Sequence, residues 1–322
     1  QNALLLRALM PIALIGIASW TYQRMRSERA SRMQADLMQT TASLELESKR
    51  LERQRNFTAM LAHEPLIRLA VFLGVLAAML LLEHAFPRRA QRLSWRRWPG
   101  NFGLVVISSL LVRLIAPAAA MGAALYAEAA GIGVLRWLGL NGLAGGIVAV
   151  LLLDLLIYFQ HRVFHAVPVL WRLHRVHHAD PELDASSGLR FHPVEILLSM
   201  AIKMAAVVAL GAPAEAVLVF EVLLNATSLF NHANLALPAW LDGALRLVLV
   251  TPDMHRIHHS EVPAETDSDF GFCLSCWDRL FGTYRAEPAA GQLGMVIGVA
   301  EFRADPEQRL DRLLVQPFRK AG

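Results

Sequence analysis

The chain alternates between long apolar runs and polar stretches. The apolar runs cover residues 3–20, 69–86, 103–127, 139–160 and 194–230. Each has about 18 residues or more, which is the length that a helix needs to cross a bilayer. The last run is broken at Gly211-Ala212-Pro213, where a helix ends readily, so it predicts a hairpin of two helices. The pattern therefore predicts an all-α integral membrane helical bundle.

Residues 28–60 interrupt this pattern with a stretch rich in Glu, Arg, Gln, Ala and Leu. Such a composition predicts a long exposed helix that could form a coiled coil. The stretch from Glu52 to Glu64, which ends in Leu61-Ala62-His63-Glu64, resembles the signalling helix and phosphoacceptor region of sensor histidine kinases. No nucleotide-binding glycine motif follows, so we assign no phosphotransfer to His63. The chain begins with Gln1 and is expected to be a fragment or a processed form.

Arginines beside the apolar runs predict the orientation of the chain. Five arginines and two tryptophans lie between Pro87 and Pro99, and such a loop is typical of a cytosolic membrane interface. This orientation places everything after residue 160 on the cytosolic side. It conflicts with Arg24 to Arg32, which predict a cytosolic exit after 3–20. Either the run 69–86 is re-entrant or interfacial, or two unrelated parts have been joined. We favour two joined parts, a kinase-like leader over 1–66 and a membrane-embedded domain over 67–322.

Composition supports a membrane protein. Of 322 residues, 55% are hydrophobic and 18% are charged, with a mean hydropathy of +0.39, and soluble domains carry about 25% charged residues. The formal net charge is only +4, and the basic residues flank apolar runs, so no nucleic-acid partner is expected. Lys203, Glu215 and Glu221 lie inside the last apolar run and should face the protein interior or the interface. Cys273 and Cys276 are expected to be reduced thiols, since two cysteines make no disulfide framework.

Eight histidines fall into three clusters. His161 and His165 stand four apart, and the pattern His-x-x-His-His occurs at 174–178 and again at 255–259. Residues i, i+3 and i+4 share one face of a helix, so each cluster can aim its imidazoles at one point. Neutral imidazole binds iron, zinc, copper and nickel. The clusters therefore predict a metal site, and their number fits two metals with four to five imidazoles each.

Other residues near the clusters extend this hypothesis. Asp154 and Asp253 are candidates to orient a ligating imidazole through a hydrogen bond. Thr251 and Pro252 should begin the helix that carries His255. Between the clusters, His232 is a further candidate ligand. His192 is a possible tenth ligand. His84 ends an apolar run, and we expect it at the membrane interface rather than at the metal site.

These residues resemble the fatty acid hydroxylase and sterol desaturase superfamily, in its bacterial branch, over roughly residues 67–320. The motifs that carry the resemblance are Asp154…His161-Arg-Val-Phe-His165, Trp171-Arg-Leu-His174-Arg-Val-His177-His178, Arg190-Phe-His192-Pro193, Asn231-His232-Ala-Asn234, Pro252-Asp-Met-His255-Arg-Ile-His258-His259 and Trp277-Asp-Arg-Leu-Phe-Gly-Thr-Tyr284. The resemblance implies a membrane-embedded di-iron oxygenase whose histidines lie on a cytosolic helical cap.

The resemblance also implies the ligand set. It assigns as metal ligands His161, His165, His174, His177, His178, His232, His255, His258 and His259. His192 is absent from some members, so its role stays open. Asp269 stands where members often have Asn, which leaves any contact made there open. Two iron ions are the expected cofactors, with zinc as a substitute in isolated protein.

The expected reaction uses O₂ to hydroxylate or desaturate a C–H bond of a lipid or sterol-like substrate. No electron-carrying segment is visible, so a separate ferredoxin, cytochrome or reductase is expected, docking on the arginine-rich surface. The expected location is the bacterial inner membrane, with the histidine site facing the cytoplasm.

Three alternatives were weighed. A zinc-dependent membrane hydrolase would need a general base in a motif such as His-Glu-x-x-His, which is absent. A metal-binding or transport protein would place ligands at mid-membrane rather than beside the apolar runs. A signalling role would need a kinase catalytic domain. The sequence leaves open which lipid is the substrate and whether the product is an alcohol or an alkene.

Overall fold

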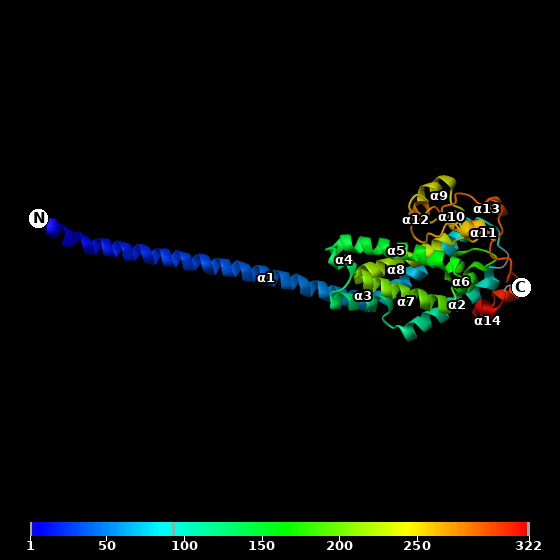
Figure 1. Ribbon diagram of the computed structural model, residues 1–322, viewed down its shortest axis with the longest axis horizontal. Helices are drawn as coiled ribbons and strands as arrows, with labels where there is room; N and C mark the ends of the chain where they lie inside the picture. The colour runs from blue at the N-terminus through cyan, green and yellow to red at the C-terminus, as the bar shows by residue number, and fades with distance from the viewer. Residues whose placement is uncertain (1, 92–93, 321–322) are drawn as a thin grey trace. The chain divides into compact units, whose positions relative to one another are not determined.

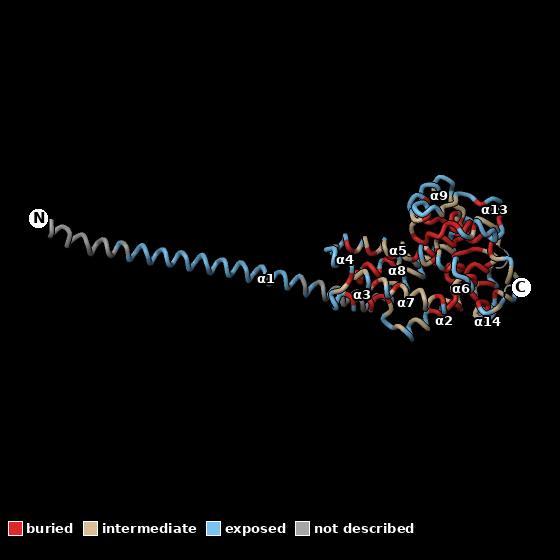
Figure 2. The backbone as a smooth tube through the Cα atoms, in the orientation of Figure 1, coloured by how far each residue is buried: buried red, intermediate tan, exposed pale blue. Residues whose placement is uncertain are grey.

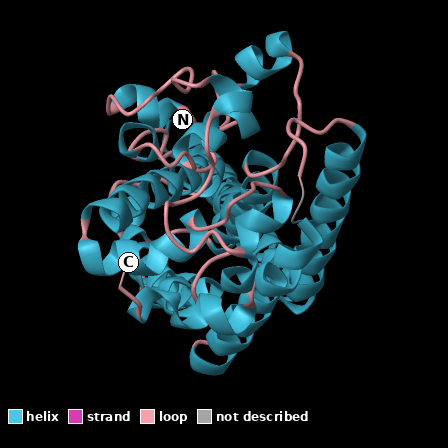
Figure 3. Ribbon diagram, turned by 90° about the vertical axis from the view of Figure 1, so that its right-hand side faces the viewer, coloured by secondary structure: helices cyan, strands magenta, loops and turns pink. Residues whose placement is uncertain are grey.

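The computed structural model describes residues 2–91 and 94–320, with side chains at 16, 18–49, 51, 52, 55, 63–91 and 95–320. The chain divides into two compact units, Gln1–Pro65 and Leu66–Gly322. Figure 3 shows helices joined by loops, and the described part of the chain contains isolated β-bridges but no strand. The prediction of an all-α membrane bundle is confirmed.

The helices are α1 (Asn2–Ala85), α2 (Ser94–Ile115), α3 (Ala119–Ala130), α4 (Val134–Trp137), α5 (Gly142–Ala166), α6 (Pro168–His178), η1 (Ala185–Leu189), α7 (Pro193–Leu210), α8 (Ala214–Asn231), α9 (Ala239–Leu245), α10 (Pro252–His258), α11 (Pro263–Thr266), α12 (Cys276–Leu280), α13 (Gly291–Gly294), η2 (Asp305–Gln308), α14 (Leu310–Val315) and η3 (Gln316–Phe318) (Figure 1). The boundary between the two units falls within α1.

The first unit is helical throughout its described length. The helix predicted over 28–60 is present as part of α1, and residues 18–49 are exposed along it (Figure 2). A coiled-coil partner for this segment stays a prediction. The membrane helix predicted over 3–20 also stays a prediction, because most of its side chains lie outside the described residues.

Five stretches in the described residues are long and apolar enough to cross a membrane: His63–Ala85, Trp95–Trp137, Gly142–Ala166, Pro193–Leu210 and Ala214–Asn231. One expectation is wrong in detail, because 103–127 is not a single helix. Helix α2 ends at Ile115 and α3 begins at Ala119. Pro117 lies in this break, where its ring and its missing N–H disfavour a continuous helix.

The hairpin predicted over 194–230 is confirmed. Helix α7 ends at a left-handed Gly211 (φ 65°), whose N–H bonds to the carbonyls of Val207 and Val208. A Cβ added at Gly133 would lie 2.2 Å from the Cα of Gly211. The α3–α4 turn and the α7–α8 turn therefore pack backbone against backbone, which fixes the end of the bundle remote from the histidines.

The arginine-rich segment after α1, predicted as a loop at the cytosolic membrane interface, is helical from Ser94 onward. Helix α2 includes Arg97, whose side chain is fully buried and donates to both oxygens of Asp180 at 2.6 Å. The same guanidinium pairs with Asp184. Arg97 is therefore a packing element rather than a lipid-facing charge, because two carboxylates and the Glu182 carbonyl accept from its two terminal nitrogens.

Charged residues within the spans form a buried ion pair. Lys203 on α7 donates to Glu221 on α8 at 2.6 Å, and Arg68 on α1 donates to the other oxygen of Glu221, also at 2.6 Å. The interior placement of Lys203 and Glu221 is confirmed. Glu215 is exposed in the first turn of α8, so it lies outside the protein interior, and its position at the interface stays a prediction.

Replacing Glu221 by Gln should destabilise the bundle. The substitution leaves the Lys203 ammonium buried without its carboxylate, and breaking such a pair costs about 3 kcal/mol or more. The Arg68 pair adds less, because its side chain is a third exposed to solvent or lipid. Thermal unfolding in detergent, followed by helical circular dichroism, should show a lower midpoint for Glu221→Gln. The matched control Glu215→Gln should unfold at the same midpoint as the wild type. Equal midpoints for all three proteins would contradict this account.

Candidate metal centre

Nine histidines gather where α5, α6, α8 and α10 meet. His161 and His165 lie on the last turns of α5, and the cluster at 174–178 ends α6. His232 follows α8 directly, and α10 carries His255 and His258 behind the Thr251 cap and Pro252, as predicted. Figure 2 shows that buried residues are concentrated around α6 and its neighbours at this end of the bundle.

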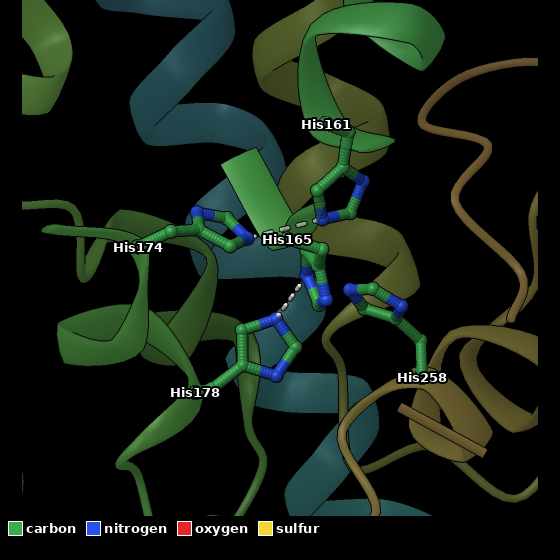
Figure 4. Close-up of side chains that lie close together, drawn as sticks. All are labelled: His161, His165, His174, His178 and His258. Atoms are coloured by element: carbon green, nitrogen blue, oxygen red, sulfur yellow. Dashed lines mark hydrogen bonds between the residues drawn. The ribbon is translucent and has the colours of Figure 1, made fainter. Parts of the chain in front are cut away.

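The histidines form two groups that could each hold a metal ion. The first group is His161, His165, His174, His178 and His258 (Figure 4), and the second is His177, His232, His255 and His259. Within each group the candidate ligand atoms all lie within 4.8 Å of one another. All nine side chains are almost completely buried.

The expectation that each cluster aims at one point holds for His161 and His165 but is wrong for the two His-x-x-His-His motifs. In α6, His174 and His178 belong to the five-histidine group while His177 belongs to the four-histidine group. The second motif divides in the same way, because His258 joins the first group and its two companions join the second. Neighbouring residues are about 100° apart around a helix, so the last two histidines of each motif diverge and can serve two centres.

Hydrogen bonds at Nδ1 set the orientation of five imidazoles. His161 Nδ1 donates to the Phe270 carbonyl at 2.9 Å, His232 Nδ1 to the Ser228 carbonyl at 2.7 Å, and His258 Nδ1 to the Ser268 carbonyl at 2.8 Å. The other two are His165 Nδ1, which lies 3.2 Å from Asp267, and His174 Nδ1, which lies 2.7 Å from Glu195. A neutral imidazole has one N–H, so each Nε2 carries a bare lone pair.

The Nε2 atoms of paired histidines face one another. His161 and His174 are 3.1 Å apart at Nε2, and both are bare because their N–H groups are used at Nδ1. Figure 4 shows this pair and the pair His165–His178, at 3.2 Å. Two lone pairs repel at this distance unless a cation lies against both. Nitrogen ligands at about 2.1 Å from one ion and at right angles to each other would be about 3 Å apart.

The second group shows the same arrangement. His232 Nε2 lies 3.0 Å from His177 Nε2 and 3.1 Å from His255 Nε2. Both ring nitrogens of His259 are buried and have no hydrogen-bond partner in the described residues. The same is true of His258 Nε2 in the first group. Unpaired buried polar atoms are costly, so these residues fit a metal ion in both groups.

Burial keeps these imidazoles neutral and therefore able to bind a metal. Burial, followed by repulsion from neighbouring imidazoles, lowers the pKa of His177, His178 and His259 well below its usual range. Burial also lowers the pKa of His232 to about 4. A lone pair is therefore present at physiological pH.

Both aspartates predicted to orient imidazoles contact other groups instead. Asp154 accepts from the backbone N–H groups of Cys273 and Leu274 at 3.2 Å and from the Trp277 indole at 2.9 Å. It therefore anchors the loop after Phe272, because three donors occupy its carboxylate. Cys273 and Cys276 are both free.

Asp253 was the second such candidate, and it also makes no contact with a histidine. Its carboxylate accepts from Arg88 at 3.0 Å and pairs with Arg256. It therefore attaches α10 to the segment after α1.

Three other histidines lie outside both groups. His192 caps α7, with Nδ1 accepting from the Val194 N–H and Nε2 donating to the Leu314 carbonyl. Both of its nitrogens are occupied, so the structure does not bring this candidate tenth ligand to the centre. His84 is exposed at the end of α1, and His63 belongs to neither group.

Sequence reasoning missed the two carboxylates that contact the histidines. Glu195 lies in the first turn of α7, buried against His174, and Asp267 follows α11 and reaches His165. Glu195 follows the Arg-Phe-His-Pro motif by two residues, and this position was the available signal. Aromatic rings complete the walls, since Phe191 stacks on His177 at 4.2 Å and Phe270 meets His165 at 5.1 Å edge to face.

Comparison with known proteins bears on this centre. The fatty acid hydroxylase family model matches residues 146–283, a stretch that includes all nine grouped histidines. Over these residues, called the hydroxylase domain below, the chain is similar to this family. The expected resemblance to the hydroxylase and desaturase superfamily is confirmed. The kinase-like leader lies outside the hydroxylase domain and stays a prediction.

Curated relatives of the hydroxylase domain act on lipids, according to their names. Ornithine lipid hydroxylase OlsE of Rhizobium tropici is 32% identical over 169 residues, which is 52% of this chain and 48% of the relative. Alkylglycerol monooxygenase of Danio rerio is 33% identical over 158 residues (48% and 34%), and that of Homo sapiens is 30% identical over 137 residues (40% and 28%). The chain thus spans half or less of each relative. No solved structure matches.

Asp269 should make the stability of the hydroxylase domain depend on pH. It adopts a left-handed φ of 50° and accepts from the Arg285 N–H, while its other oxygen is buried and has no hydrogen-bond partner among the described residues. Burial, opposed by that hydrogen bond, raises its pKa to about 8. The folded state therefore keeps a proton that the unfolded state releases near pH 4, so stability is lost as pH rises from about 4 to 8.

Asp269→Asn should remove this loss, because the amide stays neutral and Asn tolerates a left-handed φ. Relative to wild type, the variant should gain at least about 1 kcal/mol between pH 5 and pH 8. Thermal midpoints in detergent at the two pH values measure the gain. If the thermal midpoints of wild type and variant differ by the same amount at both pH values, the pKa of Asp269 is not raised.

Proposed function

We propose that this chain is a membrane di-iron oxygenase that uses O₂ to hydroxylate a C–H bond of a lipid. The observation that carries the proposal is the pair of buried histidine groups in which Nε2 atoms of different helices face one another at about 3 Å. A centre made of imidazole alone, without thiolates and with room for further ligands, suits iron that handles O₂. The named activities of the relatives support hydroxylation over desaturation.

The residues have defined tasks in this proposal. The five-histidine group and the four-histidine group would each hold one iron, and bound iron supplies the redox chemistry that activates O₂. The carbonyls of Phe270 and Ser228 fix the tautomers of His161 and His232, so their Nε2 lone pairs are in place before a metal arrives. Zinc would fit the same donors in isolated protein.

Exclusion of water is the second task of the protein. Phe191, Phe270 and Phe272 pack against the imidazoles, and Phe270 and Phe272 are themselves buried. A dry surround protects an oxidising centre from side reactions. The apolar spans adjoin this centre, so an acyl or alkyl chain can reach it from the bilayer without passing through water.

The positive-inside rule supports a cytosolic position of the centre. Arg88 lies just past the span His63–Ala85 and pairs with Asp253 on α10, next to His255. The centre therefore lies at the arginine-rich end of the spans, which faces the cytosol in most membrane proteins. We propose the bacterial inner membrane as the location, by analogy with the bacterial relative.

Two further parts of the proposal concern electrons and domains. No electron-carrying segment was recognised in the sequence, so we expect a separate ferredoxin, cytochrome or reductase to dock on the basic cytosolic surface. We also propose that residues 1–66 form a kinase-like leader, distinct from the lipid-modifying domain over 67–322.

Removing one ligand from either group should abolish the reaction. His177→Ala and His258→Ala take one imidazole from the four- and five-histidine groups, and each should reduce lipid product by at least about 100-fold. The measurement is lipid mass spectrometry of cells supplied with ¹⁸O₂, looking for a gain of one labelled oxygen. Retained product in either variant would overturn the assignment of that group.

The matched control is His192→Asn. Asparagine keeps the helix cap of α7 and removes an imidazole that belongs to neither group. This variant should keep its product. Metal analysis separates the alternatives, because two irons per chain support the oxygenase and one zinc with hydrolysed lipid would support a hydrolase. A loss of two hydrogens instead of a gain of oxygen would identify a desaturase.

A further inference from the structure

The two histidine groups differ in the partners of their ligands. In the five-histidine group, His174 Nδ1 lies 2.7 Å from a carboxylate oxygen of Glu195, and His165 Nδ1 lies 3.2 Å from one of Asp267. In the four-histidine group, the described residues offer no carboxylate hydrogen bond. The only Nδ1 partner there is the Ser228 carbonyl, which His232 contacts.

This difference changes the donor strength of the imidazoles. A histidine that donates its N–H to a carboxylate is a more basic ligand than one that donates to a carbonyl, and its ring orientation is fixed. The carboxylate also balances part of the charge of a buried dication, which neutral imidazoles cannot do. The five-histidine group therefore has one more ligand and two anionic partners.

Glu195 is well placed for this role. Its side chain is buried, one oxygen contacts His174, and the other has no hydrogen-bond partner in the described residues. A buried carboxylate is costly without a nearby positive charge, and a cation bound through His174 would provide that charge. Asp180 is a buried carboxylate that acts electrostatically on His232, but Arg97 occupies both of its oxygens.

From these contacts we infer that the two metal positions are unequal. The five-histidine group is the high-affinity position, held by the His174–Glu195 and His165–Asp267 pairs, and the four-histidine group is the labile position. A form with one metal per chain is therefore populated at intermediate metal concentration. The inference rests on the proposed metal centre but not on its reaction with O₂ or lipid.

Zinc is a suitable probe because it has no redox chemistry. The full chain, purified in detergent and stripped of metal, is equilibrated with Zn²⁺ against a graded competing chelator, and zinc per chain is measured by mass spectrometry. Wild type should load in two steps of one zinc each, separated by at least about tenfold in affinity. His255→Ala should lose the weaker step and keep the tighter one.

The carboxylates are tested by isosteric amides. Glu195→Gln keeps an oxygen that can accept from His174 but removes the charge, so the tighter step should weaken by about 10- to 100-fold while the weaker step stays in place. Asp267→Asn should act in the same direction and to a smaller extent, because Asp267 is 64% exposed. The matched control is Glu215→Gln, which replaces an exposed carboxylate on α8 and should change neither step.

The outcomes separate the inference from the proposed function. One cooperative step of two zinc ions in wild type, or a shift of only the weaker step in Glu195→Gln, would overturn the inequality even if the lipid product forms. Two steps without any oxygenated lipid would overturn the oxygenase and leave the inequality standing. Glu195→Gln is used only if it shows wild-type helicity and a single gel-filtration peak. If it does not fold, the zinc titration of Asp267→Asn tests the inequality instead, because its exposed side chain tolerates the change.

Discussion

Facing lone pairs at the end of the bundle are the interaction on which the rest of the structure depends. Burial removes the water that would otherwise separate the imidazoles, and it also prevents them from accepting a second proton. The nitrogens of His161 and His174 then repel at 3.1 Å unless a cation lies against both. The segments around the centre orient these rings, because their carbonyls and carboxylates bind the N–H side of His161, His174 and His232 and so turn it away from the centre.

A second buried network carries the backbone that presents the histidines. Arg97 joins α2 to the loop after α6 through Asp180 and Asp184. Arg190 reaches the carbonyl of Val176 on α6 at 2.8 Å and the side chain of Gln308 near the C-terminus, also at 2.8 Å. Burial lowers the pKa of Arg190 only to about 10, so it stays charged at physiological pH. Rigid ion pairs of this kind restrict α6 to one position, and the centre requires that precision.

Local patterns in the sequence predicted the parts that depend on neighbouring residues. The apolar runs predicted the spans, Thr251 and Pro252 predicted the start of α10, and the number of clustered histidines predicted a centre for two metals. The division of each His-x-x-His-His motif between two groups depends on how α6 and α10 face each other, and spacing alone does not determine that. His232 has no helical spacing to a cluster, and the family resemblance supported its place as a candidate ligand.

Tertiary contacts account for the predictions that were wrong or missing. Asp154 lies on the same helix as His161, but the loop around Trp277 supplies donors for its carboxylate. The contact of Glu195 with His174 joins two helices separated by residues 179–192, which include η1, so sequence spacing does not indicate it. Arg97 lies among arginines that suggest a membrane surface, and only the fold brings Asp180 against it. Partners of this kind are set by packing, which a single sequence does not display.

The histidine groups also have a consequence for the mechanics of the chain. Their facing pairs join residues 13, 55 and 23 positions apart, so a bound cation acts as a cross-link that closes several loops at once. Closing a loop removes conformational freedom mainly from the unfolded chain. A ligand present at 1,000 times its dissociation constant adds about 4 kcal/mol to stability. Helices α6 and α10 are short, and the strength of their attachment to the spans therefore varies with metal supply.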